Sequence, residues 1–237
     1  MTARAKAQPQ QLVLELPHRE AQEAQDFLVS RSNAAAVDLV DGWPGWPHPA
    51  ALVVGPAGSG KSHLANVWRL RSHAELVAAK DLSEAAIGMF EARRALVVED
   101  IDRGIGSEQV FFHLMNLARE TAGSLLLTSR IAPGEIVISL PDLRSRLRAT
   151  APVMIEVPDE ALMRSVLVKL FSDLQLNVEP HVVSYLALHI DRSMDVAMRV
   201  VARCNRLSLA MQRKVTRAVA AAALEAEEAD GDELGER

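Results

Sequence analysis

Residues 51–62 read ALVVGPAGSGKS, in which four apolar residues precede a glycine-rich stretch ending in Gly-Lys-Ser. The apolar run predicts a buried strand, and the residues from Lys61 onward predict a helix. The stretch therefore matches the GxxxxGKS phosphate-binding loop in the strand–loop–helix context that this motif requires. Backbone N–H groups of the loop can wrap phosphates, Lys61 can reach the terminal ones, and the Ser62 hydroxyl can ligate magnesium. The predicted nucleotide-binding residues are Gly55, Pro56, Ala57, Gly58, Ser59, Gly60, Lys61, Ser62 and His63.

Short aliphatic runs alternate with helical patterns through the first two thirds of the sequence. Because these runs are almost continuously apolar, they predict strands buried on both faces of a mainly parallel sheet in a doubly wound α/β domain. After Pro158 only helical spacing recurs, which predicts a small all-helical domain. The predicted strands are 51–55, 75–79, 95–100, 124–129 and 153–157. The predicted divisions are a flexible segment 1–17, an α/β domain 18–157, a helical domain 158–224 and an acidic disordered tail 225–237.

Acidic and hydroxyl residues follow two of the other predicted strands. Glu99 and Asp100 lie in LVVEDID, residues 96–102, where a nucleotide site needs carboxylates that order its metal. Capping of the following turn is the alternative for either residue. Thr128 and Ser129 end the strand in LLLTSR, where a hydroxyl can sense a terminal phosphate or orient a water. We take Glu99, together with Ser62, as a magnesium ligand and Asp100 as a catalytic candidate.

The segment LPDLRSRLRA, residues 140–149, carries three arginines at alternate positions. On a short helix Arg144 and Arg148 share a face, whereas Arg146 points to roughly the opposite side. One interpretation is a solvated basic helix. The other is an arginine finger aimed at the nucleotide of a neighbouring molecule.

The segment QQLVLELP, residues 10–17, places leucines at alternate positions before the first predicted core strand. In one interpretation it is an edge strand whose leucines cover the core. In the other it is an extended peptide bound by another protein, with Gln11 forming a directional hydrogen bond and Leu14 and Leu16 filling an apolar pocket. The alternation alone slightly favours the strand, whereas the terminal position after a polar stretch favours the peptide.

Composition narrows the class of protein. Residues 225–237 carry seven acids and one arginine, a net −6, so with a total net charge of −5 residues 1–224 carry +1 and are nearly neutral. A strongly basic nucleic-acid footprint is therefore absent. A single cysteine suits a reducing compartment, the first residues lack the apolar middle of a secretory signal, and no apolar run approaches the ~20 residues of a membrane helix. A cytoplasmic location is expected.

In sequence order, GPAGSGKS, LVVEDID, EQVFFHLMNLARE, LLLTSR and LPDLRSRL followed by a helical lid resemble the AAA+ module of the bacterial replication initiator DnaA. LPDLRSRL and the later DRSMD and QRKVT segments are similar to the Hda-type homologues that regulate DnaA, and this resemblance extends from about residue 11 to 224. It implies an AAA+ P-loop fold, with a parallel sheet between helices, that binds ADP or ATP with Mg²⁺. FLVSRSN at 27–33 is similar to the segment that packs near the adenine.

The resemblance also implies partners and roles. The protein would dock on the DNA-loaded sliding clamp, the β subunit of DNA polymerase III, through Gln11, Leu14 and Leu16. There it would promote hydrolysis of DnaA-bound ATP, with Arg146 as the arginine finger. DNA would be met only through the clamp, and a homodimer stays open as an alternative to a monomer.

Three departures from the initiator pattern affect the protein's own nucleotide site. Glu99 stands where DnaA has a metal-ordering aspartate, and Arg130 stands where it has an acidic sensor. Asp195 falls where the lid arginine is expected, with Arg199 one turn further as a substitute. They favour weak or no ATPase activity of its own. The alternative is an autonomous AAA+ ATPase of the helicase-loader or initiator type. A DNA-binding initiator fragment is disfavoured by the near-neutral body and by the sequence ending after the lid.

Overall fold

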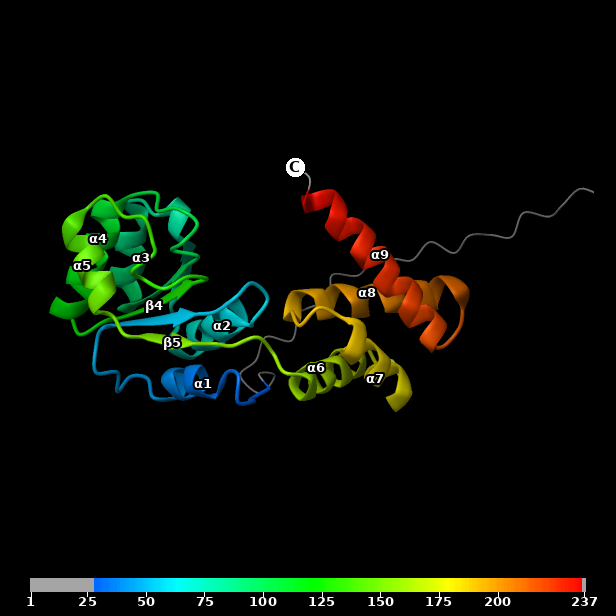
Figure 1. The fold of residues 1–237 in the computed structure, drawn as a ribbon. Coiled ribbons are helices and arrows are strands. Elements are labelled where there is room, and N and C mark those ends of the chain that lie inside the picture. The colour runs from blue at the N-terminus through cyan, green and yellow to red at the C-terminus, as the bar shows by residue number, and fades with distance from the viewer. Residues whose placement is uncertain (1–27, 236–237) are drawn as a thin grey trace, which may run out of the picture.

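A five-stranded parallel sheet forms the centre of the first half of the molecule (Figure 1). The computed structural model describes residues 28–235, and the side chains of residues 28–230. The strand order is β2-β3-β4-β1-β5, and each neighbouring pair is parallel. The strands are β1 Ala50–Val54, β2 Glu75–Ala78, β3 Ala95–Glu99, β4 Ser124–Ser129 and β5 Pro152–Met154. The predicted α/β fold with a parallel sheet is confirmed.

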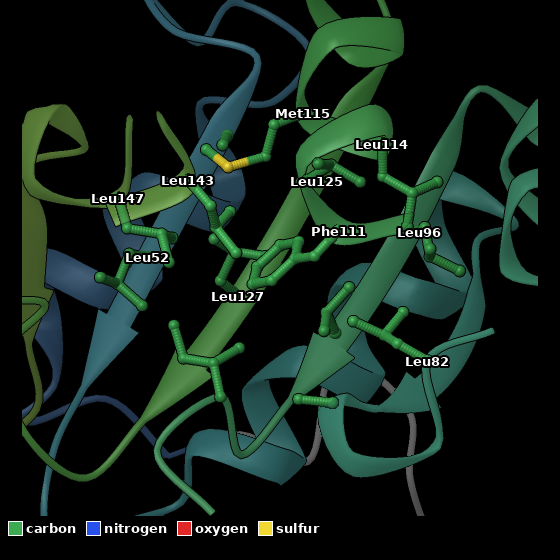
Figure 2. Packing of buried hydrophobic residues seen from close by; sticks show 14 of the residues in the cluster. Leu52, Leu82, Leu96, Phe111, Leu114, Met115, Leu125, Leu127, Leu143 and Leu147 are labelled. Atoms are coloured by element: carbon green, nitrogen blue, oxygen red, sulfur yellow. The ribbon is translucent and has the colours of Figure 1, made fainter. Parts of the chain in front are cut away.

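Helices cover both faces of this sheet, so the three central strands are buried on both sides. On one face α3, α4 and α5 pack against alternate strand residues, and Figure 2 shows Phe111, Leu114 and Met115 of α4 among leucines of β3 and β4. On the other face α1 and α2 pack against the intervening residues around Trp68. These helices are α1 Ala34–Asp41, α2 Lys61–Ser72, α3 Ala85–Arg93, α4 Glu108–Glu120 and α5 Pro141–Ala149.

The two edge strands differ from the sequence prediction, which placed every strand between two buried faces. Glu75 and Leu76 of β2 are exposed, and so are Pro152 and Met154 of β5. An edge strand has a neighbour on one side only, and less of it is covered by the flanking helices. Within the predicted strand 153–157, pairing ends after Met154, and Ile155 alone adds a backbone bond to β1, from its N–H to the carbonyl of Val54.

A second hydrophobic core lies in the helical domain. Four helices surround it, and their buried residues include Phe171, Leu186 and Cys204. Asp159 caps α6 by accepting the N–H of Leu162. The helices are α6 Glu160–Asp173, α7 Pro180–His189, α8 Met194–Met211 and α9 Arg217–Gly235. None of the helices among the described residues is both long and apolar enough to cross a membrane.

The last helix corrects the sequence analysis, which predicted a disordered acidic tail from residue 225. Residues 225–235 continue α9. The cause is a set of contacts with α8: Arg203 donates to the carbonyl of Ala226 at 2.9 Å and to the carboxylates of Glu227 and Asp230. The pair is well shielded, because the Arg203 and Glu227 side chains are only 18% and 12% exposed. The acidic residues that were expected to form a solvated, disordered tail therefore belong to the helix.

Candidate functional site

The residues predicted for the nucleotide site meet at the carboxyl edge of the sheet. The phosphate loop follows β1, Glu99 ends β3 and Asp100 follows it, and Thr128 and Ser129 end β4. Since β3, β4 and β1 are neighbours in the sheet, the three ends lie side by side along one edge. The N–H of Gly55 donates to the carbonyl of Ser129 at 3.1 Å, which ties the loop to β4. Crevices at the carboxyl ends of parallel strands are where open α/β sheets bind ligands.

The loop takes its shape from two glycines with positive φ. Gly58 has φ +66° and Gly60 has φ +97°, conformations that side chains with a Cβ rarely adopt. Gly60 is also the residue that precedes the first turn of α2, so the first N–H groups of that helix face the loop. This is the geometry in which a phosphate is bound by backbone N–H groups and by the positive end of the helix dipole.

Lys61 is the best-buried charged group of the site, with 6% of its surface exposed. Its Nζ donates to the carbonyls of Gly55 at 2.7 Å and Pro56 at 2.8 Å, so the ammonium lies inside the loop. Burial lowers the pKa of Lys61, and the nearby positive charge of Arg130 acts in the same direction. The negative charges of Asp100, Asp102 and Asp195 oppose this lowering of the Lys61 pKa. A bound phosphate, being anionic, would likewise compensate the positive charge of the Lys61 ammonium.

The remaining loop residues divide between the surface and the interior. Pro56, Ala57 and the first-turn residue Ser62 are exposed, and His63 is half-buried. The Ser59 hydroxyl is buried and has no hydrogen-bond partner among the described residues.

The acids after β3 are held by β4. Asp100 has φ +55°, and its N–H donates to the Thr128 hydroxyl at 3.0 Å. Its carboxylate lies 3.7 Å from Arg103. Glu99 is half-buried, and its Oε1 is buried with no hydrogen-bond partner in the part of the chain that is described. A carboxylate oxygen that is shielded and unpaired at this position suits a metal or a metal-bound water.

The two predicted sensors are buried and already engaged. The Thr128 hydroxyl, in a residue 1% exposed, holds the backbone of Asp100. The Ser129 hydroxyl donates to the carbonyl of Ile131 and accepts the N–H of the same residue. These contacts shape the loops around the site. Sequence reasoning missed Asp102, which accepts the N–H of Arg130 at 3.0 Å and fixes the β4 end to the β3 end.

The lid touches the phosphate loop directly, through backbone contacts that no sequence motif indicates. The N–H of Met194, the first residue of α8, donates to the carbonyl of Gly58 at 2.7 Å. Ser193 caps α8 and lies against Gly58. Asp195 follows in the first turn, whereas Arg199 is paired with Glu227 on α9 at 2.6 Å. Arg199 therefore does not take the place of the expected lid arginine at the nucleotide site.

Gly58→Ala tests this lid contact. A Cβ on Gly58 would lie 1.9 Å from the Ser193 hydroxyl, in addition to a backbone cost of about 1–2 kcal/mol for a positive φ. We expect a lower melting temperature and faster hydrogen exchange at the Met194 N–H. Gly88→Ala is the matched control, because a Cβ on this exposed α3 glycine meets nothing within 4 Å. Equal effects of the two substitutions would contradict the contact.

Arg146 lies away from the phosphate loop. It lines a groove of about 510 Å³ with His48 and Pro49, which precede the amino end of β1, whereas the loop follows the carboxyl end. Pro49 and Gly55 flank this strand and are therefore separated by about 20 Å, at 3.3 Å per residue. Arg144 and Arg148 are exposed, but Arg146 is half-buried, with its guanidinium 5.0 Å from the centre of the Phe112 ring.

Two further sequence predictions concern other parts of the chain. The peptide residues Gln11, Leu14 and Leu16 fall outside the described residues. Of the segment 27–33, residues 28–33 are described and form a small network: Asn33 accepts the N–H of Ser30, and Ser32 accepts the N–H of Glu156 after β5.

Solved structures with the same arrangement identify the fold. Domain III of the replication initiation protein DnaA from Thermotoga maritima superposes with a TM-score of 0.73 at 18% identity, covering 89% of this chain and 98% of that one. The fold is that of an AAA+ module. RuvB from Thermotoga maritima, a Holliday junction branch migration motor, gives a TM-score of 0.67 at 15% identity, covering 86% of this chain and 72% of that one.

A further AAA+ neighbour was solved with a nucleotide analogue. AMPPCP-bound DnaA from Aquifex aeolicus has a TM-score of 0.63 at 17% identity, covering 78% of this chain and 64% of that one. No protein-family model matches the sequence, and no curated protein matches it. At these identities the likeness establishes the AAA+ fold.

Proposed function

We propose that this AAA+ protein is a nucleotide-bound negative regulator of DNA replication initiation, which promotes hydrolysis of the ATP bound to DnaA while docked on the sliding clamp. The observation that carries the proposal is the position of Arg146 at the opposite end of β1 from the chain's own phosphate loop. An arginine so placed serves the nucleotide of another molecule. Positive charge supplied in trans to a transferring phosphoryl group is an established means of accelerating its hydrolysis.

The protein's own ligand in this proposal is ADP or ATP with Mg²⁺. The phosphate loop and Lys61 would hold the phosphates, and Ser62 with Glu99 would hold the ion, directly or through water. The unpaired Oε1 of Glu99 and the exposed Ser62 hydroxyl fit such an ion. The likeness to an AMPPCP-bound DnaA supports a nucleotide at this place. The ion would neutralise phosphate charge.

Weak turnover in this pocket follows from the groups around it. Asp195 rather than an arginine lies in the first turn of the lid helix, and Arg199 is directed to Glu227. A second candidate function, an autonomous AAA+ ATPase, is favoured by the similarity to the RuvB motor. Denaturing the purified protein and identifying the released nucleotide separates the two. Bound ADP with no steady turnover of added ATP supports the regulator, and steady turnover supports the motor.

Clamp docking is tested through the peptide segment. We expect Gln11→Ala combined with Leu14→Ala to weaken binding to the β sliding clamp at least about tenfold, a loss of about 1.4 kcal/mol, because the directional hydrogen bond and one apolar anchor are both removed. Surface plasmon resonance on immobilised clamp measures this. Melting temperature and nucleotide content should stay at wild-type values. Gln8→Ala combined with Gln10→Ala is the control.

Two outcomes oppose the clamp hypothesis. A double variant that binds clamp as the wild type does removes the peptide role. A double variant that unfolds supports the edge-strand interpretation, in which the leucines cover the domain core.

A further inference from the structure

We propose that Phe112 and Glu108, one turn apart on α4, are positioning residues that hold Arg146 ready for the nucleotide of a second molecule. The inference rests on the proposed function. It assigns roles to two side chains that sequence analysis left out of the site. Phe112 fixes the guanidinium, and Glu108 fixes the beginning of the helix that carries it.

The contact with Phe112 restrains the arginine head. The guanidinium carbon lies 5.0 Å from the centre of the ring, within the range of a cation–π interaction. Phe112 is partly buried against the core, so the ring itself is held in place. A long exposed arginine samples many rotamers, and a flat aromatic surface that selects one of them lowers the entropy lost when the guanidinium meets a phosphate.

Glu108 replaces a helix cap at the start of α5. Leu140, the residue before that helix, makes no side-chain cap, and Pro141 follows it. The carboxylate of Glu108 accepts the N–H of Ser139 at 2.9 Å and of Leu140 at 2.6 Å. A carboxylate at a helix amino terminus is also favoured by the helix dipole. Because these bonds join positions 31 and 32 residues apart, they fix where α5 begins relative to α4.

The rotation of α5 is fixed by its buried face. Leu143 and Leu147 are fully buried, and Figure 2 shows both in the same core as Phe111 and Met115 of α4. With that face inward, Arg144 and Arg148 are exposed, and Arg146 lies at the flank beside Phe112. Contacts with α4 therefore fix where α5 begins, how it is rotated about its axis and where the guanidinium of Arg146 lies.

The stacked arginine remains reachable from one side. Phe112 and Arg146 both line the groove of about 510 Å³ that also includes Arg119 and Asp142. Simple packing of an arginine on a phenylalanine would give the same contact. The difference between packing and positioning is measurable, because only positioning changes the rate of a reaction in which the arginine acts.

The experiment compares Phe112→Leu, which keeps an apolar side chain but removes the ring, with Phe112→Tyr, which keeps the ring. Hydrolysis of DnaA-bound ATP is followed over a range of regulator concentrations with clamp and DNA present. We expect Phe112→Leu to lower the maximal rate about two- to fivefold, the rate equivalent of an exposed cation–π contact, with an unchanged half-saturating concentration. Phe112→Tyr should retain the wild-type rate, and Glu108→Gln should lower the maximal rate with nucleotide content unchanged.

A second readout does not involve DnaA. The Nε–H signal of Arg146, assigned by its loss in Arg146→Ala, should be displaced by the ring current in the wild type and in Phe112→Tyr. In Phe112→Leu it should move to the position of an unstacked arginine. Melting temperatures of all variants establish that they are folded.

The outcomes separate the inference from the function on which it rests. Loss of rate and of the displaced signal in Phe112→Leu, with both kept in Phe112→Tyr, supports positioning. A Phe112→Leu variant that stimulates as the wild type does overturns positioning and leaves the proposed function standing. A wild type that shows the displaced signal but never stimulates DnaA overturns both the function and the positioning role, while the contact stands.

Discussion

Arg146→Ala is expected to stimulate the hydrolysis of DnaA-bound ATP about 10³–10⁵-fold less than the wild type, the worth of an arginine supplied in trans in well-studied phosphoryl transfer. The variant should fold, because the buried residues of α5 are Leu143 and Leu147. It should also keep its own nucleotide, because Arg146 lies at the far end of β1 from the phosphate loop. A coupled assay of ADP formation on DnaA measures the loss.

Arg144→Ala is the matched control for this prediction. Arg144 belongs to the same helix and is exposed, without the ring contact that Arg146 makes. Its removal changes the charge of α5 by the same amount. If the two variants lost activity equally, the helix would act as a basic surface, and the assignment of a finger to Arg146 would be wrong.

Lys61→Ala is expected to abolish nucleotide binding and, with it, the stabilisation that nucleotide confers. At a ligand concentration 100 times Kd that stabilisation is about 2.7 kcal/mol. Without nucleotide, the variant should be nearly as stable as the wild type that also lacks nucleotide. The substitution removes the hydrogen bonds of the ammonium to the carbonyls of Gly55 and Pro56, but it also relieves the desolvation cost that lowers the pKa of Lys61, so the two effects oppose each other.

Thermal unfolding with and without added ADP measures both quantities. Lys80→Ala is the control, since this lysine is exposed on the short 3-10 helix after β2. The control should keep the full nucleotide-dependent rise in melting temperature. A Lys61→Ala variant that kept the same rise would show that the loop does not carry the phosphates.

Local sequence patterns predicted the parts of the molecule that local chemistry determines. The phosphate loop needs glycine at positions 58 and 60 because both residues have positive φ, and the motif GxxxxGKS together with its glycine-rich loop indicates this requirement. Continuous apolar runs predicted the parallel sheet. Helical periodicity predicted that Arg146 lies on a different side of its helix from Arg144 and Arg148.

Features that depend on distant residues were missed. Glu108 reaches the backbone of Leu140 across 32 residues, and Arg203 reaches Asp230 across 27. Because of the contact between Arg203 and Asp230, the segment predicted to be a disordered tail forms the end of a helix. Nothing in the local composition of the acidic segment indicates an arginine on α8, so only the fold could show it.

Hydrolysis of DnaA-bound ATP in the presence of this protein tests the central claim most directly. ATP-loaded DnaA is incubated with the β clamp loaded on DNA, with and without the regulator, and the nucleotide on DnaA is identified over time. We expect rapid conversion to ADP only when the clamp, DNA and this protein are all present, and no steady turnover by this protein alone. DnaA-bound ATP that persists at its basal rate in the complete mixture would contradict it.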